Sequence, residues 1–117
     1  MSRLKSKFGQ HYLVELIGCD AAQLKFVKDV KSVFLKSARE SRATVLKSYF
    51  YQFKPSGVSG VLLIAESHFS VHTWPEDRYA AVDIQTCGKM YPERAIAVMQ
   101  EGFAARRVKI KVIPRGF

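Results

Sequence analysis

The sequence predicts an α+β fold, a two-layer αβ-sandwich in which a mostly antiparallel sheet carries two helices on one face. Runs of β-branched and aromatic residues indicate strands, and two stretches with apolar residues at helical spacing indicate amphipathic helices. Turn residues between consecutive strands favour antiparallel neighbours. The predicted order is β-α-β-β-β-β-α-β, and the 117 residues are expected to form a single domain, 1–117.

The first strand and the first helix are predicted near the N-terminus. Residues 11–19 are dense in β-prone side chains and predict a strand. Asp20 follows as a helix N-cap, and the helix is expected to run from Ala21 to about Glu40. One face of this helix is expected to be buried, because apolar residues recur at helical spacing. These residues are Leu24, Val27, Val30, Phe34 and Ala38.

Four strands are predicted in the middle of the chain. Residues 58–65 are nearly all apolar, so this strand is expected to be buried. A Pro-Ser-Gly turn at 55–57 precedes it, and Pro75 ends the strand that follows it. The four predicted strands are residues 44–53, 58–65, 68–73 and 79–86.

A second helix and a last strand complete the prediction. The helix opens at Tyr91, with Pro92 in its first turn. Residues 108–113 alternate between apolar and basic side chains, which predicts a strand. The apolar residues of the helix are Ala95, Ile96, Val98, Met99 and Phe103.

The formal charge of +9 raises the question of a nucleic-acid or other anionic partner. The basic residues are scattered along the chain, and no RNA-recognition signature or basic-aromatic platform is present. This pattern favours a solvated basic surface over a nucleic-acid footprint. No nucleic-acid partner is therefore expected.

The apolar runs and the cysteines bear on location and redox state. No run approaches the ~20 apolar residues that a membrane helix needs, and no long apolar segment follows the basic N-terminus. The cytoplasm is therefore the expected location, with no membrane partner. Cys19 and Cys87 are expected to be free thiols, because two cysteines without a signal segment do not make a disulfide framework.

Residues 66–76 concentrate the chemistry-bearing side chains of the chain. This segment holds two of the three histidines and the only tryptophan. His68 and His72 are four residues apart, a spacing that suits metal ligands on a helix. The β-prone composition favours a strand here, so no metal site is expected. Taken singly, each polar residue or thiol is more often structural than functional.

Four separated motifs together resemble the prokaryotic S-adenosylmethionine decarboxylase proenzyme family. They are residues 56–61 (SGVSGV), 66–68 (ESH), 72–76 (HTWPE) and 86–88 (TCG). The motifs occur in the family's order at family-like intervals, and the resemblance extends from residue 8 to residue 116.

The resemblance implies that the chain cleaves itself. The Ser67 hydroxyl would attack the Glu66 carbonyl carbon and convert the peptide bond into an ester. His72 matches the proton acceptor of this processing, and Ser59 matches a residue that assists it. The products would be a β chain, 1–66, and an α chain, 67–117, whose first residue becomes a pyruvoyl group derived from Ser67.

The resemblance also implies a decarboxylase that needs neither a metal nor pyridoxal phosphate. The pyruvoyl group would form a Schiff base with S-adenosylmethionine and act as an electron sink. Cys87 matches the proton donor, and Phe53, Trp74 and Glu76 are the expected substrate-binding residues. The product would be the aminopropyl donor for spermidine biosynthesis, and the expected assembly is a homodimer of processed αβ protomers.

Strand geometry sets one condition on this mechanism. Ser67 and His72 are five residues apart, so in a straight strand they face opposite sides of the sheet. They could cooperate only if the chain bends or bulges between them, or if Ser67 lies outside the regular strand.

Three alternative functions remain open from the sequence. A pyruvoyl-dependent arginine or ornithine decarboxylase would use the same processing. An unprocessed, non-catalytic binding or regulatory protein would keep the fold without the reaction. A small nucleic-acid-binding protein would account for the positive charge.

Overall fold

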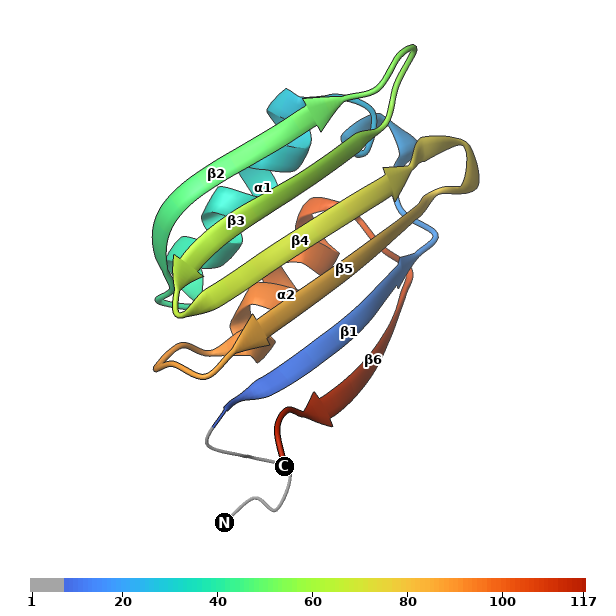
Figure 1. Cartoon of the computed structure of the whole chain (residues 1–117). Coiled ribbons are helices and arrows are strands. Elements are labelled where there is room, and N and C mark those ends of the chain that lie inside the picture. The colour runs from blue at the N-terminus through green and yellow to red at the C-terminus, as the bar shows by residue number, and fades with distance from the viewer. Residues whose placement is uncertain (1–7) are drawn as a thin grey trace.

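A single antiparallel sheet forms one layer of the molecule, as predicted (Figure 1). The computed structural model describes residues 8–117, and within this range six strands pair in the order β2-β3-β4-β5-β1-β6. Every neighbouring pair is antiparallel. The strands are β1 (Gln10–Ile17), β2 (Thr44–Gln52), β3 (Val58–Ala65), β4 (Ser67–Trp74), β5 (Tyr79–Thr86) and β6 (Arg107–Pro114).

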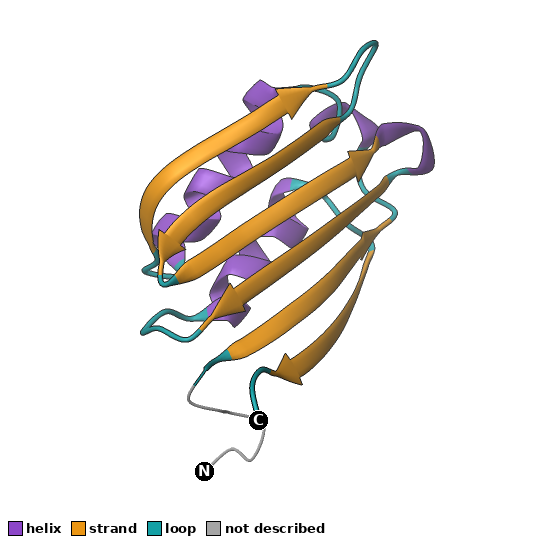
Figure 2. Cartoon of the chain, in the orientation of Figure 1, coloured by secondary structure: helices purple, strands orange, loops and turns teal. Residues whose placement is uncertain are grey.

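The second layer consists of helices α1 (Val27–Glu40) and α2 (Pro92–Gly102), which cover one face of the sheet (Figure 2). The core lies between the layers. The Phe34 ring of α1 contacts both the Phe69 ring of β4 and Phe103, with ring centroids 6.4 Å apart in each pair. All three rings are fully buried, and burying each contributes about 1.5–3 kcal/mol. These rings pack α1 against β4 and against the residue that follows α2.

Helix α1 begins at Val27, so the predicted start at Ala21 is wrong. Residues Ala21–Gln23 form only a short 3-10 turn, which the Asp20 side chain caps. Tertiary hydrogen bonds use the next carbonyls: the Leu24 carbonyl accepts from the Thr73 hydroxyl (2.8 Å), and the Lys25 carbonyl accepts from the backbone N–H of Gly57 (2.9 Å). These two carbonyls accept hydrogen bonds from β4 and from the loop between β2 and β3, and the helix starts after them.

Strand β3 is buried on one face only, so the predicted burial holds for half of its side chains. Val58, Leu62 and Ile64 face the helices and are buried, whereas Val61 and Leu63 are exposed on the other side. The apolar residues of 58–65 thus lie on both sides of the sheet, some against the helices and some on the opposite, exposed side. In β2 the register shifts between Val45 and Lys47, which interrupts the regular alternation expected for that strand.

The side of the sheet opposite the helices is here called the open face. Neither described helix covers it (Figure 1). The strand register places one row of its side chains across the whole sheet. That row is Tyr49, Val61, Ser70, Asp83, Leu13 and Lys111. Among the described helices, none is long and apolar enough to cross a membrane.

Candidate active site

Ser67 occupies an unusual backbone position at a tight hairpin. Strands β3 and β4 are joined through Glu66 alone, and Ile64 pairs with Ser67 directly across the turn. The Ala65–Glu66 peptide bond is cis. Ser67 has φ = 127°, a conformation that L-residues rarely adopt. Such a conformation costs about 1–3 kcal/mol, and residues of this kind cluster at functional sites.

Cys87 lies beside this hairpin, immediately after β5. Thr86, the last residue of β5, pairs with Ser67 on β4. The Cys87 thiol donates a hydrogen bond to Glu66 Oε1 over 3.1 Å. This hydrogen bond is the main cause of the raised pKa of Cys87. Glu66, Ser67 and Cys87 together are called the hairpin cluster.

A second group of predicted residues gathers at the other end of β3 and β4. Ser59 and His72 are cross-strand partners, and Ser59 Oγ and His72 Nδ1 share a hydrogen bond of 2.8 Å. Phe53, Trp74 and Glu76 line the same pocket, which has a volume of about 260 Å³. These five residues are called the His72 cluster. The Trp74 ring also stacks on Tyr79, with centroids 5.4 Å apart.

The structure does not bring Ser67 and His72 together in one chain. Both lie on β4, and β4 pairs with β3 and β5 in unbroken register between them. The bend or bulge that a one-chain site would need is therefore absent from this strand, and Ser67 lies inside it. Five residues of extended strand span about 16 Å. The predicted site residues thus form two clusters at opposite ends of β4.

Asp83 is the centre of a polar network on the open face that sequence reasoning missed. Its Oδ2 lies 2.5 Å from His11 Nε2 and 3.2 Å from His68 Nε2. The Ser70 hydroxyl donates to Oδ1. Burial raises the pKa of Asp83, but the hydrogen bonds from Ser70, His11 and His68 outweigh it, so the net pKa is lowered.

Hydrogen bonds account for the contacts of the network around Asp83. His11, His68 and Asp83 present donor atoms within 4.8 Å of one another, a spacing that could hold a cation. The Arg115 guanidinium, however, donates to His11 Nδ1 over 3.2 Å, so Nε2 carries the proton and donates to Asp83. His68 and His72 are separated by about 13 Å of strand and cannot share one ion.

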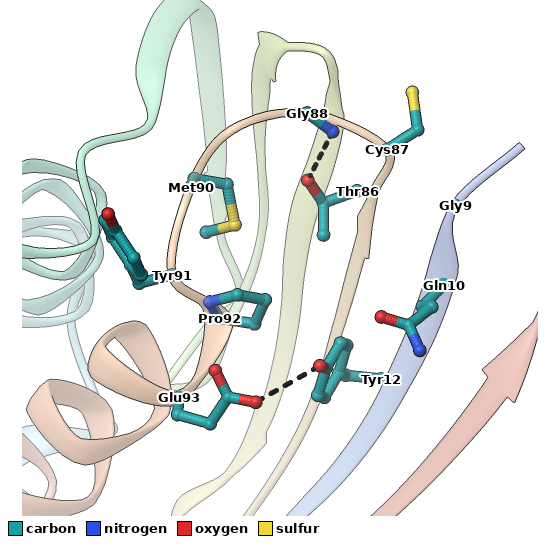
Figure 3. Close-up of a pocket in the computed structure, with 10 residues that line it drawn as sticks. All are labelled: Gly9, Gln10, Tyr12, Thr86, Cys87, Gly88, Met90, Tyr91, Pro92 and Glu93. Atoms are coloured by element: carbon teal, nitrogen blue, oxygen red, sulfur yellow. Dashed lines mark hydrogen bonds between the residues drawn. The ribbon is translucent and has the colours of Figure 1, made fainter. Parts of the chain in front are cut away.

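A pocket of about 350 Å³ lies between the end of the sheet and the start of α2 (Figure 3). The Tyr12 hydroxyl donates to Glu93 Oε2 at its wall, over 3.3 Å. Burial and the neighbouring Glu93 raise the pKa of Tyr12. The Cys87 sulfur points away from both residues (Figure 3). The thiol therefore faces the hairpin rather than this pocket.

Comparisons with known proteins place the sequence and the fold beside one group of decarboxylases. The family model described as S-adenosylmethionine decarboxylase matches residues 10–116. An S-adenosylmethionine decarboxylase proenzyme of Pyrococcus abyssi is 46% identical over 109 residues, covering 92% of this chain and 78% of that protein. The S-adenosylmethionine decarboxylase proenzyme of Acetivibrio thermocellus is 44% identical over 109 residues, covering 92% of this chain and 88% of that protein.

A solved structure is similar over nearly the whole chain. The crystal structure of the adenosylmethionine decarboxylase from Aquifex aeolicus superposes with a TM-score of 0.86 at 36% identity. The match covers 94% of this chain and 92% of that one. The sheet and its two helices are thus the architecture of that decarboxylase.

Proposed function

The chain belongs to the S-adenosylmethionine decarboxylase family, and from this premise we propose that it is a self-processing, pyruvoyl-dependent decarboxylase of S-adenosylmethionine. The observation that carries the proposal is the hairpin cluster, in which Ser67 has a strained backbone and the preceding residue, Glu66, accepts a hydrogen bond from the Cys87 thiol. The product is the aminopropyl donor for spermidine biosynthesis, and the cytoplasm is the expected location.

Processing begins with attack of Ser67 Oγ on the Glu66 carbonyl carbon. A new C–O bond forms as the C–N bond breaks, which gives an ester. His72 then accepts the Cα proton of residue 67, a Cα=Cβ double bond forms as the bond between Oγ and Cβ breaks, and the β chain 1–66 leaves with a new carboxylate. Hydrolysis at residue 67 releases ammonia and leaves the pyruvoyl group at the start of the α chain 67–117. Ser59, hydrogen-bonded to His72, orients the imidazole.

Each remaining site residue has a role in decarboxylation. The pyruvoyl group supplies the electron sink for loss of carbon dioxide, so the proposal needs no pyridoxal phosphate or metal. Cys87 holds the proton to be donated, and its raised pKa keeps the thiol protonated at neutral pH. Phe53 and Trp74 offer aromatic faces to the adenine, and Glu76 offers a carboxylate to the ribose hydroxyls.

We further propose that each active site is built from two copies of the chain. The hairpin cluster has the nucleophile and the thiol, and the His72 cluster has the base and the nucleoside pocket, yet about 16 Å of β4 separates them. We propose that the second copy packs on the open face with its β4 antiparallel to the first, which would place its His72 cluster over the end of β4 where the hairpin cluster lies. The two-fold axis then makes two identical sites.

The open face has the side chains that such an interface needs. Tyr49, Val61, Leu63 and Trp74 are exposed there in the single chain, and a second copy would remove their apolar surface from water. The axis would pass near Ser70, because this residue lies close to the middle of β4. The proposed assembly is therefore a symmetric homodimer of processed αβ protomers.

The substrate is tested by carbon dioxide release. The purified protein is given carboxyl-labelled S-adenosylmethionine, arginine or ornithine in parallel. We expect release from S-adenosylmethionine alone, because the aromatic faces and the carboxylate of the His72 cluster suit a nucleoside. Turnover of arginine or ornithine would instead establish another pyruvoyl decarboxylase. A stable, uncleaved chain that releases nothing from any of the three would establish a non-catalytic protein.

A further inference from the structure

We propose that the Glu66 side chain is a positioning residue for Cys87, holding the thiol in place as a proton donor after Glu66 has served as the cleavage site. The inference rests on the proposed function and deepens it. Glu66 would then act twice: its carbonyl takes part in processing, and its side-chain carboxylate takes part in decarboxylation.

The contact between the two residues is built from separate segments of the chain. Glu66 lies in the hairpin between β3 and β4, and Cys87 follows β5, yet Sγ and Oε1 are 3.1 Å apart. A Cβ added to Gly88 would lie 3.3 Å from the Glu66 backbone nitrogen. A Cβ added to Gly9 would lie 2.7 Å from Cys87 Cβ, inside contact distance. Because Gly9 and Gly88 lack a Cβ, the segment before β1, the β3–β4 hairpin and the segment after β5 can pack closely together around the Cys87 thiol.

The Glu66 carboxylate is the group that keeps the proton on the thiol. It accepts the S–H hydrogen bond, and this bond is the main cause of the raised pKa of Cys87. Both residues line a depression of about 370 Å³. Glu93 does not replace Glu66, because the Cys87 sulfur points away from Glu93 (Figure 3).

Cleavage leaves this arrangement available for catalysis. After processing, Glu66 is the last residue of the β chain, so its side chain can stay on Cys87. When carbon dioxide has left, the proton moves from Cys87 Sγ to the substrate α-carbon, and the sulfur becomes a thiolate. The adjacent carboxylate repels this negative charge, so the thiolate regains a proton from water and the donor is restored.

The positioning role is tested first on the uncleaved chain. In a Ser67→Ala background, the pH dependence of Cys87 alkylation by iodoacetamide is compared for Glu66, Glu66→Gln and the matched control Glu93→Gln. Cys19 is fully buried, and peptide mapping assigns the modified thiol. We expect Glu66→Gln to move the alkylation midpoint to lower pH and to raise the rate at neutral pH about threefold or more. Glu93→Gln should leave the profile unchanged.

The cleaved enzyme supplies the second readout. Processed Glu66→Gln should lose about tenfold in kcat with KM nearly unchanged, because the donor rather than the nucleoside pocket is altered. An unchanged alkylation profile, or an equal shift with Glu93→Gln, would overturn the inference even if Glu66→Gln blocks cleavage. A shifted alkylation profile in the Ser67→Ala background, combined with a wild-type protein that releases no carbon dioxide from S-adenosylmethionine, would instead retain the contact and reject the proposed function.

Discussion

Replacing Ser67 by alanine is expected to leave the chain as a single polypeptide and to abolish decarboxylation. Alanine lacks the Oγ that attacks the Glu66 carbonyl, so no ester forms, no peptide bond breaks and no pyruvoyl group arises. Denaturing electrophoresis should show one band in place of two. Carbon dioxide release from S-adenosylmethionine should fall to the background rate, because the electron sink is absent.

Cys87→Ala is the matched control for this variant. It removes the thiol but keeps Ser67, so cleavage should proceed while decarboxylation slows by about 10²–10⁴-fold. Thermal melts of both variants would establish that the fold is retained. An active Ser67→Ala protein would refute the processing mechanism. A Cys87→Ala protein that fails to cleave would refute the division of roles between the two residues.

Co-expression of two inactive variants is expected to restore cleavage of one of them. A Ser67→Ala chain keeps its His72, and a His72→Ala chain keeps its Ser67, so a mixed dimer contains one complete site. In that site the intact His72 serves the intact Ser67 across the interface. The His72→Ala chain should therefore be cleaved, and the Ser67→Ala chain should stay whole. With random pairing, about a quarter of the wild-type activity is expected.

The identity of the cleaved chain makes this experiment specific. Mass spectrometry distinguishes the two chains, and each variant expressed alone should remain uncleaved. If the site were built within one chain, neither variant would be cleaved in the mixture. Efficient cleavage of His72→Ala expressed alone would show that another group accepts the proton.

The strand pattern of the sequence was sufficient to predict the sheet and its two helices. Residues 79–86 were predicted as a strand with the bounds that the structure has, since alternating polarity reports one buried face. The start of α1 was not predictable in this way. It depends on hydrogen bonds from Thr73 and Gly57, which lie far along the chain from the carbonyls that accept them.

The site residues were named from motifs, but their arrangement required the structure. Strand parity identified the conflict between Ser67 and His72 and suggested a bend in the strand. The regular register of β4 excludes such a bend. We therefore propose that two chains share the site. The Asp83 network could not be predicted from the sequence either, because His11 and Asp83 are 72 residues apart along the chain.

The mass of the purified wild-type protein tests the central claim most directly. Self-processing predicts two fragments divided between Glu66 and Ser67. The second fragment should be lighter than the unmodified 67–117 peptide by one ammonia and should resist Edman sequencing, because a ketone replaces its amino terminus. A single intact chain of 117 residues that persists under native conditions would contradict the account, as would a second fragment that begins with an unmodified serine.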